Sequence, residues 1–337
     1  MPGRRTARHR TRRGAALALA AALVAALAGA AQSDAGAQAP GRAYRIGVLN
    51  DALAANHPTV EGLKAGLREL GLVEGRDVAF EIRFTQGDPA AAREGAALFA
   101  QAGVDLLFTS NEQPTRAAMA ATKTIPIVFT LVGDPVAARI VPKLAAPAGN
   151  VTGISSLTPE LAAKRLELLK TLAPAARRVW AIHQADDPVA LAVVANAAAA
   201  AAQLDLKLVP RPVGSKEALA RALKEIRPGD ALLAPDRGPL DISGALLDLS
   251  LAARVPAVFP ASFYVGYGGL ASYGSDYYAE GFQAARLVAR ILRGTRPEAL
   301  PVEGADKLDL AVNLKTAADL RLTVPRKILL RADTLRR

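Results

Sequence analysis

Residues 104–129 read VDLLFTSNEQPTRAAMAATKTIPIVF and contain the pattern that decides the fold. Two apolar runs, 104–108 and 125–129, flank a polar loop and a helical stretch over 114–122. Short, continuous apolar runs are typical of strands that are buried on both faces of a sheet. A helix between two such runs indicates a parallel pair with a helical crossover. The segment therefore predicts one β–α–β unit.

The same alternation extends in both directions along the chain. Upstream, we expect strands at 44–49 and 78–84, a helix over 57–70, and a second helix that begins at Asp88-Pro89. Downstream of 152–156 the rhythm restarts, with expected helices at 161–172, 189–204, 216–226 and 242–253 and expected strands at 179–183, 206–209, 231–234 and 257–259. We expect Thr158 to cap the first of these helices and Ser215 to start the third. Since about 300 residues exceed the size of one core, the sequence predicts an α/β fold with two Rossmann-like lobes, each a parallel sheet flanked by helices.

The first 37 residues have the three parts of a secretory signal peptide. Six arginines precede an uncharged Ala/Leu/Val stretch over 14–31, and small residues at alternate positions follow it. The alternative is an N-terminal membrane anchor, although the run is short and mostly alanine. We expect cleavage and a periplasmic protein. The chain has no cysteine, which excludes a lipid-anchored lipoprotein and disulfide bonds.

Composition and motifs argue against nucleic-acid binding and against catalysis. Removing residues 1–37 takes away six arginines and Asp34, so the formal charge falls from +11 to +6, and the remaining basic residues are scattered. The sequence contains neither a nucleophile elbow nor a phosphate-binding glycine loop. Beyond residue 37 the two histidines, His57 and His183, are far apart. We expect no cofactor, no metal and no enzymatic activity.

Polar residues follow the expected strands of the first lobe. In open parallel sheets, ligands bind at the carboxyl ends of strands, beside helix N-termini. The candidate ligand-binding residues of the first lobe are Asn50, Asp51, Thr109, Ser110, Asn111, Gln113, Gly133 and Asp134. The loop at 109–115 is suited to a carboxylate or phosphate, and simple capping of the next helix is the alternative.

The second lobe offers a carboxylate and aromatic side chains. Asp236 could hold a ligand ammonium, or it could pair with Arg237 or cap the following helix. Eight of the fifteen aromatic residues lie within 259–282, among several glycines. They are either a pocket wall, with Tyr264 and Tyr273 as ligand-binding candidates, or packing at a hinge. Together these residues suit a small amphiphile with an amino-acid-like head.

Several motifs resemble periplasmic solute-binding proteins of the tryptophan/tyrosine-type ABC importers, a branch of the type I periplasmic-binding fold. The resemblance is carried by GLRELGLVEGR at 66–76, IPIVF with GDP at 125–135, GNVTG at 149–153, KRLELLK at 164–170, GGLASYG at 268–274 and VNLKTA at 312–317. It implies two lobes joined by a three-strand hinge that close on a small solute. It also implies delivery of that solute to an inner-membrane permease and its ATPase, by a protein that we expect to be monomeric.

On that plan the first lobe takes residues 44–153 and about 276–296, and the second takes 154–275 and about 300–335. A ligand-sensing domain presented to a membrane receptor would use the same binding chemistry and differ only in its partner. A secreted α/β enzyme is a further alternative. A DNA-binding regulator would need a helix-turn-helix before residue 44, where this chain has the predicted signal peptide.

Overall fold

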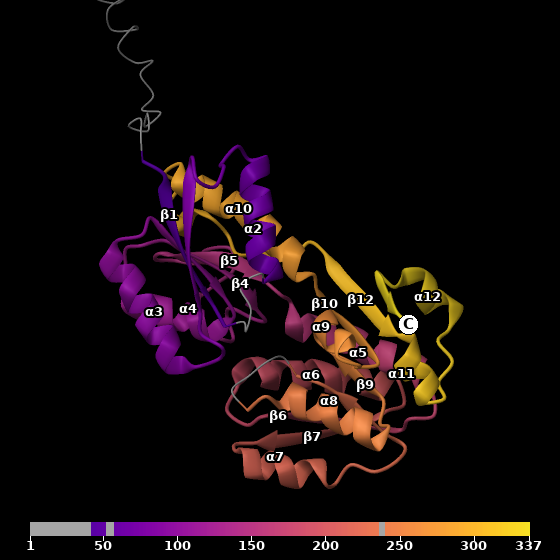
Figure 1. Cartoon of the computed structure of the whole chain (residues 1–337). Coiled ribbons are helices and arrows are strands. Elements are labelled where there is room, and N and C mark those ends of the chain that lie inside the picture. The colour runs from indigo at the N-terminus through magenta and orange to yellow at the C-terminus, as the bar shows by residue number, and fades with distance from the viewer. Residues whose placement is uncertain (1–41, 52–56, 236–239) are drawn as a thin grey trace, which may run out of the picture. The chain divides into compact units, whose positions relative to one another are not determined.

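A computed structural model describes residues 42–51, 57–235 and 240–337. The predicted signal peptide therefore lies outside the described residues. Residues 43–337 form one compact unit that contains two sheets. Each sheet, with the helices that cover it, makes one α/β lobe (Figure 1).

The first lobe is built on a six-stranded, all-parallel sheet with the order β11-β5-β4-β3-β1-β2. Its strands are β1 (Tyr44–Asn50), β2 (Val78–Phe84), β3 (Leu106–Ser110), β4 (Ile127–Val132), β5 (Val151–Ser155) and β11 (Glu303–Gly304). Its helices are α2 (Pro58–Glu69), α3 (Pro89–Ala102), α4 (Glu112–Ala121) and α10 (Tyr277–Leu292).

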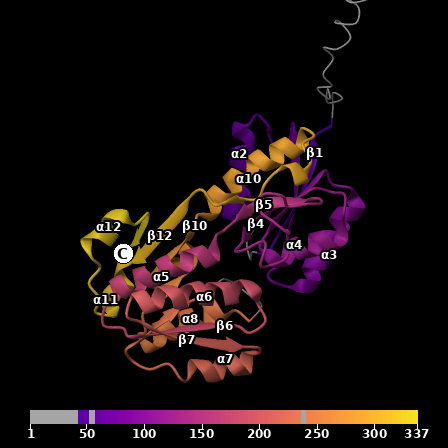
Figure 2. The same ribbon diagram turned by 180° about the vertical axis from the view of Figure 1, so that it is seen from behind.

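Alternate residues of the central strands supply two cores on the two faces of this sheet. Ile46 and Val48 of β1 pack with α2 and α10, whereas Leu49 packs with α3 and α4. Figures 1 and 2 show α2 lying beside α10. The predicted βαβ unit is present as β3, α4 and β4, and its strands are buried along their whole length.

The second lobe is built on a seven-stranded sheet with the order β13-β12-β10-β9-β8-β6-β7, in which only the β10–β12 pair is antiparallel. Its strands are β6 (Arg178–Gln184), β7 (Lys207–Val213), β8 (Asp230–Leu233), β9 (Ala257–Phe259), β10 (Ala271–Ser275), β12 (Leu308–Asn313) and β13 (Thr334–Arg336). Its helices are α5 (Thr158–Leu172), α6 (Pro188–Gln203), α7 (Lys216–Leu223), α8 (Ile242–Ala253), α9 (Ser262–Gly266), α11 (Leu314–Asp319) and α12 (Arg326–Arg331), and a short 3₁₀ turn, Pro297–Ala299, precedes β11.

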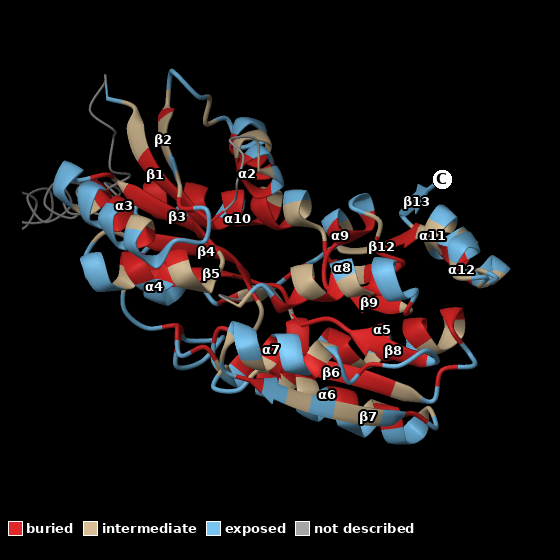
Figure 3. Cartoon of the chain, turned by 60° about the horizontal axis from the view of Figure 1, so that its bottom comes forward, coloured by how far each residue is buried: buried red, intermediate tan, exposed pale blue. Residues whose placement is uncertain are grey.

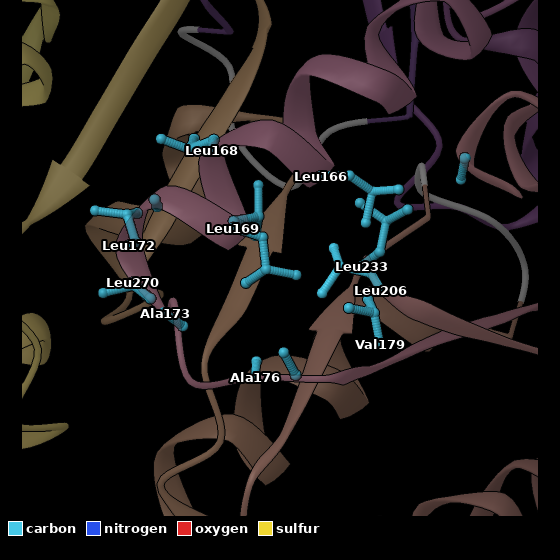
Figure 4. Close-up of a cluster of buried hydrophobic side chains, with 14 of the residues drawn as sticks. Leu166, Leu168, Leu169, Leu172, Ala173, Ala176, Val179, Leu206, Leu233 and Leu270 are labelled. Carbon is cyan, nitrogen blue, oxygen red and sulfur yellow. The ribbon is translucent and has the colours of Figure 1, made fainter. Parts of the chain in front are cut away.

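Two cores again lie on opposite faces of the sheet. Leucines of α5 and small residues of α6 pack on one face, against Val179 and Leu233, as Figure 4 shows for α5. Residues of α7 and α8 pack on the other face, around Trp180 and Phe259. In Figure 3 the central strands of the sheets are buried between helices whose outer faces are exposed.

The predicted α/β class with two Rossmann-like lobes is therefore confirmed. The chain passes between the lobes three times, after β5, after β10 and after β11. The third crossover lies between Gly304 and Leu308, slightly later than the predicted return near residue 300, because β11 adds a short edge strand to the first sheet before the chain leaves it.

Most expected helix starts are present, and one expected cap is wrong. Asp88 and Ser215 cap α3 and α7 by accepting hydrogen bonds from backbone N–H groups, as predicted. Thr158 does not cap α5: it is the first residue of the helix, and Leu157 precedes it with a left-handed φ of 55°. The chain makes this turn as it leaves β5.

Candidate functional site

A cavity lies where residues of the two lobes meet the first two crossovers. It contains about 690 Å³ of space, part of it open to solvent. Residues of the first lobe that line it are Asn111, Glu112, Leu131 and Gly133. Residues that line it from the crossovers and the second lobe are Ser156, Thr158, Arg165, Asp187, Val189, Pro260, Phe263, Tyr264, Ser275 and Tyr277.

The strand order explains why the cavity forms here. In both sheets the first strand of the lobe lies between the second and third, so the order reverses beside β1 and beside β6. Ligands of open parallel sheets collect at such switch points, outside the carboxyl ends of the strands. Asn111 follows β3, Gly133 follows β4 and Asp187 follows β6, so all three cavity residues lie at this edge of their sheets.

Arg165 supplies a cation to the cavity lining. It lies on the buried face of α5 with only 1% of its surface exposed, beside Leu166 and Leu169. Its Nε donates a hydrogen bond to the Tyr273 carbonyl oxygen at 2.7 Å, which fixes the orientation of the planar guanidinium. A buried guanidinium that lines a cavity offers paired donors suited to a carboxylate.

Two carboxylates from different lobes also line the cavity. Glu112 begins α4, where burial raises the pKa of its carboxyl, Arg116 opposes that shift, and the charge of Asp187 adds to it. Asp187 caps α6 by accepting hydrogen bonds from the N–H groups of Val189 and Ala190. The first turn of α4 therefore carries an acid whose pKa is raised in part by a carboxylate of the second lobe.

Aromatic side chains form another part of the lining. Phe263 and Tyr264 of α9 have ring centroids 4.0 Å apart, and Tyr264 also stacks on Phe259 at 5.0 Å. Tyr277 of α10 stacks on His57 of the first lobe at 5.9 Å. The aromatic-rich segment thus contributes both a cavity wall, through Phe263 and Tyr264, and contact between the second crossover and the first lobe, through Tyr277.

Of the residues that the sequence singled out, Asn111, Gly133 and Tyr264 line the cavity. Asn111 donates to the Asp51 carboxylate, which is 8% exposed, so Asp51 supports a cavity residue from behind. The Asn111 side chain makes no capping hydrogen bond to α4.

Asn50, Thr109 and Ser110 lie beneath the surface, each fully buried. Asn50 donates to the Ser110 hydroxyl, and the Thr109 hydroxyl bonds that of Thr115. These strand-end side chains therefore hold the loop in place from below.

Three other residues lie away from the cavity lining. Gln113 donates to the Gly87 carbonyl, and Asp134 accepts from the N–H groups of Val136 and Ala137. Tyr273 packs against the core between the second sheet and α5, and it lines a different surface groove. Asp236 lies outside the described residues.

The sequence alone assigns no binding role to Arg165 or Asp187. Arg165 does carry a signal in the sequence, because a charged residue interrupts the helical stripe of Ala162, Leu166 and Leu169. Asp187 precedes Pro188 and reads as an ordinary helix cap, which it also is. Nothing in its local sequence shows that it also lines the cavity.

The described residues contain no helix that is long and apolar enough to cross a membrane. Within the same ranges, no three His, Asp or Glu side chains gather as metal ligands would. The polar groups of the cavity lining are one guanidinium, two carboxylates, the Asn111 amide and hydroxyls, and aromatic rings lie beside them.

Comparison with known proteins agrees with this architecture. A curated relative, the tyrosine-binding protein of Clostridioides difficile strain R20291, is 27% identical over 266 residues, which are 77% of this chain and 76% of the relative. The crystal structure of a conserved domain protein from Vibrio cholerae is 32% identical, with a TM-score of 0.77, and the match covers 88% of this chain and all of that one.

A third relative shows the same fold at lower identity. The structure of an ABC domain in complex with L-Trp from Streptococcus pneumonia is 24% identical, with a TM-score of 0.77 over 87% of this chain and all of that one. The family described as ABC transporter substrate binding protein matches residues 48–336. The resemblance inferred from the motifs is confirmed, and the chain belongs to the ABC transporter substrate-binding protein family.

Proposed function

We propose that this chain is the periplasmic binding subunit of an ABC importer and captures an amino acid or similar small carboxylate, preferably aromatic, by closure of its two lobes. The observation that carries the proposal is the cavity lining, which combines the buried Arg165 guanidinium, the carboxylates of Glu112 and Asp187, and aromatic rings. Residues 1–37 would direct export, and a permease with its ATPase would receive the solute from a monomeric binding protein.

Each part of an aromatic amino acid has a chemical counterpart in this lining. Arg165 would bind the carboxylate through its donors. Glu112 and Asp187 would attract the ammonium group, and Phe263 and Tyr264 would pack against a ring. Asn111 and Gly133 would shape the wall, with Asp51 behind Asn111; Asp236 remains a predicted contact. Relatives named for tyrosine and crystallised with L-Trp support the same solute class.

Isothermal titration calorimetry with L-tyrosine, L-tryptophan, L-phenylalanine and L-leucine tests the solute class. Two analogues dissect the head group: tyramine lacks the carboxylate, and 3-(4-hydroxyphenyl)propionate lacks the ammonium. We expect at least one amino acid to bind and both matched analogues to bind more weakly. If none of these compounds binds or raises the melting temperature, the proposed solute class is wrong.

Arg165→Met tests the carboxylate assignment. The variant should weaken amino-acid binding roughly 30-fold or more, because a charged hydrogen-bonding partner is worth roughly 2 kcal/mol. It should leave tyramine binding nearly unchanged, since tyramine has no carboxylate to lose. Lys164→Met is the matched control, because Lys164 is the neighbouring cation on α5, pairs with Glu167 and does not line this cavity. Equal losses for both ligands would contradict the assignment.

A further inference from the structure

Three side chains lie along one line of α10 at its start. Asp276 caps the helix, and Glu280 and Gln283 follow at spacings of four and three residues. Residues at these spacings share one face of a helix. Since α10 begins directly after β10, this face lies at the second crossover between the lobes.

Two of these side chains bind the third crossover. Asp276 accepts an ion-pair hydrogen bond from Lys307 Nζ at 2.7 Å, and its backbone N–H donates to the Lys307 carbonyl at 3.1 Å. Gln283 donates to the Gly304 carbonyl at 2.9 Å and accepts from the Asp306 N–H at 3.0 Å. These contacts hold the segment between β11 and β12.

Glu280, in contrast, contacts the first crossover and strand β4 of the first lobe. The residue is 1% exposed; its Oε1 accepts from the Ser156 hydroxyl at 2.7 Å, and its Oε2 accepts from the Leu131 backbone N–H at 2.9 Å. Ser156 belongs to the first crossover, and Leu131 is the next-to-last residue of β4. One buried carboxylate therefore joins the first crossover, the second crossover and a strand of the first lobe.

The Leu131 backbone needs such an anchor. Its φ is 57°, in the left-handed region that β-strand residues rarely adopt. The pairing of β4 with β5 shifts register between Phe129 and Val132, so the ladder is interrupted there. Leu131 and nearby Gly133 line the cavity, whereas Glu280 does not. The shape of this wall thus depends on a hydrogen bond to a side chain outside the cavity.

We infer that Glu280 is a positioning residue for solute binding: it holds the Leu131 wall of the cavity in its left-handed conformation and ties that wall to Ser156 in the first crossover. This inference rests on the proposed function. The geometry requires an acceptor at the Leu131 N–H and a partner for the Ser156 hydroxyl. A glutamine at position 280 can meet both needs, with its carbonyl toward Leu131 and its amide toward Ser156.

Calorimetry with L-tyrosine and L-tryptophan on Glu280→Gln, Glu280→Asp and Glu280→Ala tests the inference. Glu280→Gln should bind nearly as the wild type does. Glu280→Asp keeps a carboxyl group but withdraws the acceptor from Leu131, so it should lose about tenfold in affinity, as should Glu280→Ala. If Glu280→Ala does not fold, the affinities of the Gln and Asp variants still test the inference. The inference would be overturned if Glu280→Gln and Glu280→Asp bound the amino acid with equal affinity, or if Glu280→Asp bound it more tightly.

Gln283→Ala is the matched control on the same helix face, because it releases the third crossover without touching Leu131. It should retain wild-type affinity for the amino acid. A loss as large as that of Glu280→Ala would show that loosening any crossover weakens binding, and it would overturn the inference that Glu280 acts through the Leu131 wall.

Amide hydrogen exchange of the ligand-free protein separates this inference from the proposed function. The Leu131 amide should exchange faster in Glu280→Ala and Glu280→Asp, and near the wild-type rate in Glu280→Gln and Gln283→Ala. If no amino acid binds the wild type, the solute proposal fails, and the exchange rates still decide whether Glu280 holds this wall. Unchanged Leu131 exchange in every variant would overturn the inference.

Discussion

Arg165 and Glu280 are both charged residues on the buried stripe of a helix. Arg165 falls between Ala162 and Leu169 on α5, and Glu280 precedes Ala284 on α10. Since burying a charge is costly without compensating contacts, a charged residue in an apolar stripe marks a position with a specific role. This pattern is visible in the sequence, although the contacts that each side chain makes are not.

The candidate residues that do not reach the cavity show the limit of prediction from sequence. Strand alternation places Tyr273 on the same face of β10 as Ala271, and that face packs on the core beside α5. The sequence does not tell which face of a late strand will be covered. Likewise, the sequence predicts Thr109 and Ser110 at the ligand, but neighbouring hydroxyls and amides bind them internally.

The raised pKa of Glu112 leads to a prediction about how ligand affinity depends on pH. Burial raises the pKa of its carboxyl, so protonation sets in at a higher pH than for an ordinary glutamate. If its charge attracts the ligand ammonium, affinity should fall as pH is lowered toward that raised pKa, because the neutral acid loses the attraction. Glu112→Gln should bind more weakly at pH 7 and show a flatter profile. Calorimetry between pH 7.5 and 5 measures this, and parallel profiles would contradict the role.

The contacts of Asp230 lead to a prediction about the stability of the folded protein. Burial alone would raise the pKa of this carboxyl, but hydrogen bonds from Arg178, the Arg227 N–H and Trp180 hold it below the usual value. The stabilisation is therefore present above the ordinary aspartate pKa and is lost as pH falls below it.

Asp230→Asn should lower the free energy of unfolding at pH 7 by roughly 2–4 kcal/mol, because it leaves buried donors poorly matched. Urea unfolding followed by circular dichroism checks this, and the stability difference between the wild type and Asp230→Asn should shrink as the pH falls below the ordinary aspartate pKa of about 4. Asp248→Asn, at an exposed position on α8, is the control. An Asp230→Asn variant as stable as that control at pH 7 would contradict the account.

Among the elements, boundaries are harder to predict than identity. The expected strand at 206–209 continues as β7 to Val213, through Pro210 and Pro212. Proline lacks an N–H for the ladder, so it argues for a strand end unless the strand lies at an edge. β7 is the edge strand of its sheet, which accommodates both prolines, but edge position follows from the tertiary fold rather than from local sequence.

The contact between α2 and α10 depends on glycine. A Cβ atom on Gly62 would lie 2.0 Å from the Tyr278 carbonyl oxygen, and one on Gly281 would lie 1.9 Å from the Thr59 carbonyl oxygen. Both obstacles are backbone atoms, so the helices would have to separate to admit a methyl group. The two glycines therefore set how closely α2 and α10 approach.

Gly62→Ala should destabilise the protein by about 1–3 kcal/mol, as overpacking of a well-packed contact does, despite the better helix propensity of alanine. Thermal unfolding followed by circular dichroism provides the measurement. Gly214→Ala is the matched control, because its Cβ would meet open space and its φ is not left-handed. A melting temperature for Gly62→Ala equal to that of Gly214→Ala would show that the helices tolerate the added methyl group.

At the scale of the whole molecule, the two sheets have the same strand order over their first five strands. The first five strands of each lobe run second, first, third, fourth and fifth across the sheet. Repeated βα rhythm is sufficient to predict two parallel lobes, because the periodicities of buried strands and amphipathic helices are local. The return of α10 to the first lobe follows from the resemblance to a family, whereas the pairing of β11 with the first sheet does not, since no local pattern specifies which sheet a late element joins.

The central claim is that the two lobes close on a small solute at the cavity lined by Arg165, Glu112 and Asp187. Small-angle X-ray scattering of the protein with and without L-tyrosine or L-tryptophan, at concentrations that saturate binding by calorimetry, tests it most directly. The account predicts a smaller radius of gyration with bound amino acid in the wild type, and a change in Arg165→Met that appears only at correspondingly higher amino-acid concentrations. Superimposable scattering curves for the empty and saturated wild-type protein would contradict it.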